Sequence, residues 1–120
     1  MKKGKNKFKW FYIDLFKVNV YYQFGPAKQY EKDMLQVFNV QIEDSGPASV
    51  GKYAIVEENE DIYFTMWVRD KRDYESIAHE AMHITHGILQ RAGIWLTDSS
   101  VETYTYLIGY IVKKITENKN

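Results

Sequence analysis

Cysteine is absent from this 120-residue chain, and histidine is rare, with only three copies. Without cysteine the chain can form no disulfide and no cysteine-ligated zinc site. Internal repeats, low-complexity stretches and linkers are absent as well, and the chain is long enough to bury a core without covalent staples. We therefore predict a single domain over residues 1–120, with a basic tail at 1–7 and a polar tail at 116–120.

An excess of charge of one sign is also absent, because 16 basic residues balance 16 acidic ones. This balance removes any global electrostatic reason to expect a nucleic-acid or membrane partner. No apolar run approaches a membrane span, and Asp14, Lys17 and Asn19 interrupt the first aromatic segment, with no small-residue cleavage site after it. We expect an intracellular protein that is neither exported by a signal peptide nor anchored.

Apolar and aromatic side chains are abundant, at 45% and 16% of the residues, which is too many for a disordered chain. Residues 8–24 are dense in aromatic and β-branched types and predict one long or bent strand. Gly25-Pro26 ends this segment and is followed by a helical pattern. The other predicted elements are strands near 53–58 and 62–68, joined as a hairpin, and helices near 73–91 and 101–115. The order β-α-β-β-α-α predicts an α+β fold with about three strands and three helices.

All three histidines lie in the helix predicted over 73–91, at positions 79, 83 and 86. At about 100° per residue they share one face of that helix. The opposite half carries the apolar stripe that should face the core. Its members are Ile77, Ala81, Ile84, Thr85, Ile88 and Leu89.

The pattern His79-Glu80-x-x-His83 is typical of zinc hydrolases. Imidazoles at i and i+4 can reach one zinc ion from the same side of a helix, at about 2.0–2.1 Å. Glu80 sits beside this pair but off the metal direction, where a carboxylate can act as a general base. The alternative is that both histidines are ordinary hydrogen-bonded side chains. One helix cannot easily aim residues at i, i+4 and i+7 at one metal ion, because seven residues span about 10.5 Å of its axis. For His86 we therefore favour a place beside the ligands, on the substrate side or simply on the surface over a role as ligand.

A catalytic zinc ion usually has three protein ligands and one open position. The extended metzincin pattern needs glycine at 86 and histidine at 89, and the chain has His86 and Leu89 there. Glu102 in the last helix, 19 residues after His83, is the predicted third ligand. The competing interpretation is a capping box, with Ser99 as the cap and Glu102 at the third helical position.

Two further residues near Glu102 enter the prediction. Asp98 is the reserve candidate for the third ligand. Tyr106 follows Glu102 by four residues and so shares its helix face. Its phenol could donate a hydrogen bond to a developing oxyanion, or it could merely pack.

The stretch "ESIAHEAMHITHGILQRAGI" followed by "SSVETYTYLIGYIVKKI" resembles small phage-encoded zinc metallopeptidases of gluzincin type. The resemblance is most specific over residues 74–112. It implies a minimal zincin-like domain, a small twisted sheet whose edge strand, Ile62–Val68, lies over the active-site helix. By the same resemblance His79, His83 and Glu102 are the zinc ligands and Glu80 is the base.

These observations predict a hydrolase of the metallopeptidase class, in which Glu80 assists the attack of zinc-bound water on a peptide bond. The substrate would be a protein or peptide, and the phage resemblance suggests the cytoplasm of an infected bacterial host, or the virion with its proteins as partners. The first alternative is a catalytically inactive zincin-fold structural or interaction protein, such as a virion component. A nucleic-acid or toxin-type module that uses the basic leader is a further alternative.

Overall fold

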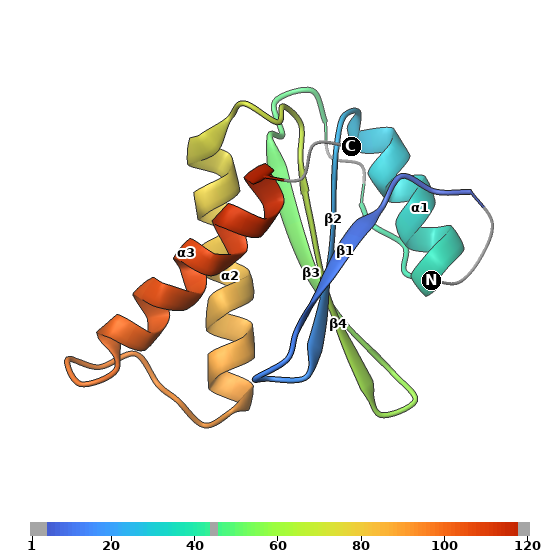
Figure 1. Cartoon of the computed structure of the whole chain (residues 1–120). Helices are drawn as coiled ribbons and strands as arrows, with labels where there is room; N and C mark the ends of the chain where they lie inside the picture. Colours follow the sequence, from blue (N-terminus) through green and yellow to red (C-terminus); the bar gives the residue numbers. More distant parts are fainter. Residues whose placement is uncertain (1–4, 44–45, 118–120) are drawn as a thin grey trace.

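A four-stranded mixed sheet separates one helix from the other two in the computed structural model, which describes residues 5–43 and 46–117. Figure 1 shows α1 on one side of the sheet and α2 and α3 on the other. The predicted α+β class is confirmed, but the predicted count of about three strands is wrong by one. The elements are β1 (Lys9–Ile13), β2 (Val18–Phe24), α1 (Ala27–Phe38), β3 (Gly51–Glu58), β4 (Asp61–Val68), α2 (Tyr74–Arg91) and α3 (Val101–Glu117).

The extra strand arises because the aromatic segment at 8–24 folds back on itself. β1 and β2 pair antiparallel, with Ile13 opposite Val18 next to the turn. Lys17 adopts a left-handed conformation with φ of 55°, and its backbone N–H donates to the carbonyl of Asp14 over 3.2 Å. Asp14 and Lys17, two of the polar residues that interrupt the apolar run, therefore lie in a hairpin turn, while Asn19 lies in β2. The segment predicted as one long or bent strand is two strands.

The predicted hairpin between the next two strands is confirmed. β3 and β4 pair antiparallel in full register, from Gly51 opposite Val68 to Glu58 opposite Asp61. Asn59 and Glu60 between them have φ values of 51° and 72°. Two consecutive positive φ values are the geometry of a tight turn whose twist matches that of the flanking strands.

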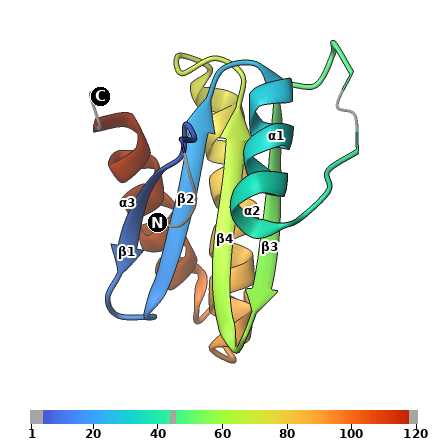
Figure 2. The ribbon, with the colours of Figure 1, turned by 90° about the vertical axis from the view of Figure 1, so that its right-hand side faces the viewer.

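The order of strands across the sheet is β1-β2-β4-β3, with β2 and β4 parallel (Figure 2). The prediction that Ile62–Val68 is the edge strand is therefore wrong, because β4 has a neighbour on both sides. Proximity along the chain cannot reveal this, since β2 precedes β4 by more than 40 residues and still pairs with it. The edge strand on the side of α2 is β3.

Each face of the sheet buries its own apolar cluster. One cluster lies between the sheet and α1 and contains Tyr30, Met34 and Trp67. The other fills the space between the sheet and the α2–α3 pair. The apolar stripe predicted for α2 is confirmed, because all six of its members are buried. This burial fixes the rotation of α2 about its axis and turns its histidine face away from the core.

Both ends of α2 are stabilised by capping hydrogen bonds from residues that flank the helix in the sequence. The Asp73 side chain accepts a hydrogen bond from the Ser76 backbone N–H over 3.1 Å, as an N-cap does. At the other end Gly93, with φ of 81°, donates to Gln90, and Ile94 donates to Leu89 over 2.8 Å. This pair of bonds is the Schellman termination of a helix. The predicted bounds of the histidine helix are therefore confirmed.

The two predicted tails lie partly outside the described residues, which exclude 1–4 and 118–120. Within the described part, the Lys7 backbone N–H donates to the buried Asp33 carboxylate over 2.8 Å, and residues 116–117 belong to α3. No helix among the described residues is both long enough and apolar enough to cross a membrane.

Candidate active site

His79 and His83 lie on successive turns of α2, with their ring centroids 5.0 Å apart and the ring planes at 69°. His79 is exposed and His83 is half-buried. Two imidazoles bound tetrahedrally to one zinc ion at about 2.0–2.1 Å would have centroids roughly 5 Å apart. The spacing of this pair therefore fits a shared metal ion.

Glu80 is buried, with 6% of its surface exposed, although it is a charged residue between two histidine turns. Its carboxylate lies against Gly51 of β3, so closely that a β-carbon added at Gly51 would be 2.8 Å from Oε2. Burial raises the pKa of the Glu80 carboxyl, and the charge of His79 opposes this rise. The result is an acid placed beside the histidine pair, with its proton affinity increased by its surroundings.

The charge of Glu80 also affects the pKa of Tyr30, which lies on the other side of the sheet. The pKa of Tyr30 is raised to about 12, mainly by burial, while its hydrogen bond with Thr65 lowers it and the Glu80 charge raises it further. The contact with Gly51 and the low exposure of Glu80 show that its carboxylate is directed toward the sheet and not toward open solvent.

Tyr53 of β3 covers one face of the His83 ring. The two ring centroids are 4.3 Å apart and the planes are inclined by only 12°. The pKa of His83 is lowered, first by burial and then by the nearby charges of His79 and His86. A lowered pKa favours the neutral imidazole, which is the form that binds metal ions.

These contacts belong to a regular series along the side of α2 that faces β3, which we call the α2–β3 seam. Every third or fourth residue of the helix meets every second residue of the strand. The match arises because one helical turn rises about 5.4 Å and two strand residues span about 6.6 Å. The contacting pairs are Glu80 with Gly51, His83 with Tyr53, Gly87 with Ile55, and Arg91 with Glu57 in an ion pair of 3.3 Å.

His86 lies on the side of α2 that faces α3. Its ring centroid is 6.4 Å from that of Tyr104, and the Gln90 side-chain amide donates to its Nε2 over 2.7 Å. The ring is exposed. Of the roles that we expected for His86, its position agrees with a surface residue near the pair.

Glu102 and Tyr106 lie on the outer side of α3. The buried positions of α3 are Tyr104, Leu107, Ile111 and Ile115. Glu102 precedes Tyr104 by two residues, which places it about 200° around the helix. Both Glu102 and Tyr106 are exposed, Tyr106 to 74%. Across residues 5–43 and 46–117, no three histidine, aspartate or glutamate side chains come together as a group able to hold a metal ion.

The loop before α3 carries the other candidates. The Ser99 hydroxyl, which could cap the helix, hydrogen-bonds the Thr97 hydroxyl over 3.0 Å. The reserve ligand Asp98 is exposed. The start of α3 is tied to the preceding loop by Tyr104, whose hydroxyl donates to the carbonyl of Ile94 over 2.6 Å.

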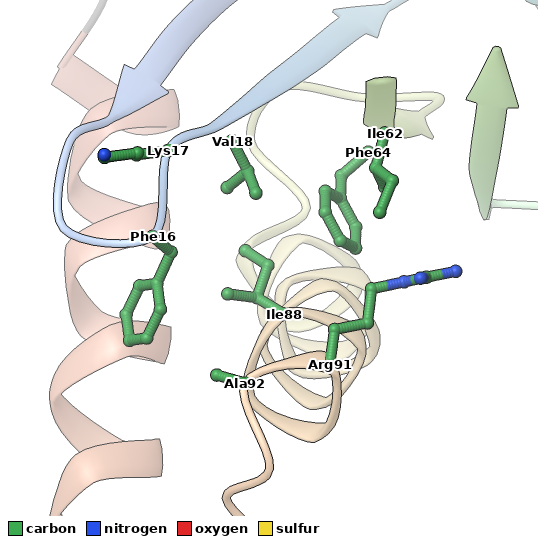
Figure 3. Close-up of a pocket in the computed structure, with 8 residues that line it drawn as sticks. All are labelled: Phe16, Lys17, Val18, Ile62, Phe64, Ile88, Arg91 and Ala92. Carbon is green, nitrogen blue, oxygen red and sulfur yellow. The ribbon is translucent and has the colours of Figure 1, made fainter. Parts of the chain in front are cut away.

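A hollow of about 230 Å³ lies at the C-terminal end of α2, beneath the β1–β2 turn (Figure 3). Its walls are mainly apolar, and the side chains of Lys17 and Arg91 point away from one another at its sides. The hollow meets α2 at the buried Ile88 and at Arg91 and Ala92, whereas the histidines lie on the outer face of the helix. This hollow is therefore separate from the histidine pair. Its lining residues are Phe16, Lys17, Val18, Ile62, Phe64, Ile88, Arg91 and Ala92.

Sequence reasoning missed the contributions of β3. A glycine at the start of a strand is a signal of close backbone approach, and Gly51 is such a residue. Tyr53 carries no comparable signal, because aromatic residues are common in strands. Comparisons of the chain with protein-family models, with curated proteins and with solved structures find no match. The function must therefore be argued from the geometry of the α2–β3 seam.

Proposed function

We propose that the chain is a zinc-dependent metallopeptidase whose active site is the outer face of α2 beside β3. The observation that supports it best is the pair His79 and His83, with ring centroids 5.0 Å apart and the buried acid Glu80 between them. Neutral imidazole nitrogens suit zinc, and the depressed pKa of His83 favours that form. The proposal includes a minimal zincin-like identity for the α+β fold and a phage origin.

The third ligand in this proposal is Glu102. It is the weakest member of the set, since it lies on the outer side of α3. To reach the histidines, the first turn of α3 would have to rotate or shift relative to α2. This turn also carries Tyr104, which is buried in the core that α3 shares with α2, so such a change would have to move Tyr104 as well.

When bound, zinc would polarise the scissile carbonyl and make the attacking water more acidic. The role of Glu80 is to take the proton from that water and to pass it to the leaving amine. Its raised pKa brings it closer to the operating pH, which improves a general base that must later act as an acid. The free edge of β3 can align a substrate backbone by strand addition, and this replaces the role predicted for Ile62–Val68. The role of Tyr106 as the hydrogen-bond donor to the oxyanion stays a prediction.

The substrate is a protein or peptide, and nucleic-acid and membrane partners form no part of this proposal. We place the activity in the cytoplasm of an infected bacterial host or in the virion.

The test begins with zinc affinity, measured on metal-stripped full-length protein by competition with a chromophoric chelator. Substituting His83 by Ala should weaken binding by more than about 100-fold, because it removes a ligand and not merely a supporting group. Glu102→Ala should weaken it as well, and His86→Ala should not. Loss of affinity in His86→Ala but not in Glu102→Ala would transfer the third ligand to His86 and leave the class of enzyme intact. Wild-type protein that binds no zinc would end the proposal.

Activity is then measured on a peptide library with Glu80→Gln as the comparison. Removal of a general base should slow cleavage by about 10²–10⁴-fold while zinc binding is retained. Cleavage that is equally fast in Glu80→Gln would contradict the assigned role.

A second candidate function is supported by one specific feature. An apolar hollow of about 530 Å³ lies between the β1–β2 turn and α3, beside Leu15 and Tyr106, which are 83% and 74% exposed. Exposed apolar surface is typical of protein interaction sites. It favours a catalytically inactive zincin-fold structural or interaction protein, for example a virion component. Zinc binding without any Glu80-dependent cleavage would select this alternative.

A further inference from the structure

The contact between Tyr53 and His83 joins the edge strand to the histidine pair. Tyr53 is 42% exposed, yet its ring lies parallel to the half-buried imidazole at 4.3 Å. The side chain of an exposed tyrosine on an edge strand can adopt several rotamers. Here the ring is stacked on the His83 imidazole, with the planes inclined by only 12°, and such ring pairs stabilise by more than the area they bury.

The position of Tyr53 does not depend on α2. It is set by the sheet, where Tyr53 stands opposite Met66 of the central strand β4. On either side of it along the seam, Gly51 meets Glu80 and Ile55 meets Gly87. The phenol is therefore presented to His83 by a rigid element, as part of a register that the whole strand shares.

His83 requires such support because the second side-chain torsion of histidine is broad and only weakly restricted. An imidazole that rotates freely must lose that freedom when it binds a metal ion. Ligand histidines are usually held by a hydrogen bond to the ring nitrogen that does not bind metal. For His83 the structure offers a parallel ring, which restricts rotation of the imidazole plane without occupying either nitrogen.

We propose that Tyr53 is a positioning residue that holds the His83 imidazole in its metal-binding orientation. This inference rests on the proposed zinc site. The ring of Tyr53 carries the effect and its hydroxyl does not.

The experiment compares Tyr53→Phe and Tyr53→Leu in the full chain. Zinc affinity is measured by chelator competition, as for the ligand variants. Tyr53→Leu removes the flat ring and should weaken zinc binding by about 10-fold or more, the range found when support for a ligand is lost. Tyr53→Phe keeps the ring and should bind zinc within about twofold of the wild type. The matched control is Tyr12→Leu, which replaces a tyrosine of similar exposure, 45%, on the other edge strand, and should leave zinc affinity unchanged.

A second readout requires no metal. In the metal-free protein the ring protons of His83 should show the upfield NMR shift that a stacked aromatic ring causes. The shift should persist in Tyr53→Phe and disappear in Tyr53→Leu, which would establish the stack independently of zinc.

The outcomes separate this inference from the proposed function. Wild-type zinc affinity in Tyr53→Leu would overturn the role of Tyr53 while the metal site stands. An equal loss in Tyr53→Phe and Tyr53→Leu would also overturn it, because the effect would then belong to the hydroxyl. No zinc binding by the wild type would remove the proposed function, and the role of Tyr53 as a ligand support with it.

Discussion

Helices α2 and α3 are sequential neighbours of nearly equal length, 18 and 17 residues, but they place their candidate functional side chains in opposite ways. On α2, Glu80 and His83 lie along the seam with β3, where a strand residue contacts each of them. On α3, Glu102 and Tyr106 lie opposite the buried stripe and face outward. One helix presents its polar residues to another element, and the other presents them to solvent.

The difference follows from how each helix is anchored. α2 packs against the sheet, and its neighbour β3 ends the sheet beside the histidine face. α3 packs through a single stripe, and a hydrogen bond from Tyr104 to the preceding loop fixes its start. Half a turn from this stripe Glu102 is exposed, and Tyr106, 74% exposed, only borders the open hollow beside the β1–β2 turn. Contacts across an interface therefore decide which residues can act together, and residue type alone does not.

The largest effect should come from a substitution at Gly51, where β3 meets Glu80 in the α2–β3 seam. In Gly51→Ala the new β-carbon would lie 2.8 Å from Glu80 Oε2 and 3.1 Å from its Cγ. The side chain is flexible, so we expect it to move and the fold to tolerate the change. Displacement of a catalytic group by about 1 Å can cost roughly 100-fold in rate, and we expect a loss of that order in kcat.

Zinc affinity should be unchanged in Gly51→Ala, since neither histidine is touched. The control is Gly109→Ala on α3, where the added β-carbon would meet no other part of the described structure within 4 Å beyond its own helix backbone and chain neighbours, and its activity should equal that of the wild type. Full activity in Gly51→Ala would mean that the position of Glu80 is not critical.

A smaller effect should distinguish the two helices by stability alone. Alanine at Gly109 should stabilise the protein by up to about 1 kcal/mol, because glycine is a poor helix former and the site is open. At Gly87 the added carbon would lie 2.8 Å from Ile55 Cδ1 and 3.1 Å from the ring of the fully buried Phe64. Overpacking of this kind costs about 1–3 kcal/mol, so Gly87→Ala should be neutral or destabilising.

Urea unfolding followed by circular dichroism measures both free energies. A stabilisation in Gly87→Ala as large as that in Gly109→Ala would show that the seam is loosely packed.

The smallest expected effect is the pH dependence that Glu80 imposes on stability. Because burial raises the pKa of its carboxyl, the folded state holds its proton more tightly than the unfolded state does. The wild type should therefore lose stability as pH rises from below the ordinary glutamate pKa, about 4.3, through the raised value in the folded protein. Above that value the loss is complete.

Glu80→Gln has no proton to lose at this position, so its stability relative to the wild type should increase over the same pH window. The free energies of unfolding are compared at a series of pH values in metal-free protein. A difference that stays constant with pH would show that the Glu80 carboxylate is well solvated.

Much of the fold could be predicted because its signals are local. The bounds of α2 follow from Asp73 and Gly93, and its buried face follows from the spacing of Ile77, Ile84 and Ile88. The hairpin of β3 and β4 follows from two short strands with a polar turn between them. The aromatic density of the segment at 8–24 continues through the turn and so predicts one long or bent strand. In the structure the chain reverses at Lys17, which has a left-handed conformation.

The candidate site could be predicted only where it lies on one helix. His79, Glu80 and His83 are neighbours in any helix, so their proximity needs no tertiary information. The burial of Glu80 and the contact of Tyr53 with His83 depend on β3, which is distant along the chain and adjacent only through the sheet. Whether Glu102 joins the histidines depends on the rotation of α3, and a stripe of buried residues fixes that rotation.

The positions of the helices and of the β3–β4 hairpin, and the side chains of α2 that share a face, follow from the sequence alone, because these features depend on interactions within one or two turns of the chain. Tertiary packing makes β4 a central strand, brings β3 beside the histidines and turns Glu102 away from them. The physical reason is that the packing of apolar surfaces sets strand order and helix rotation. These surfaces are compatible with many arrangements until all of them are buried together.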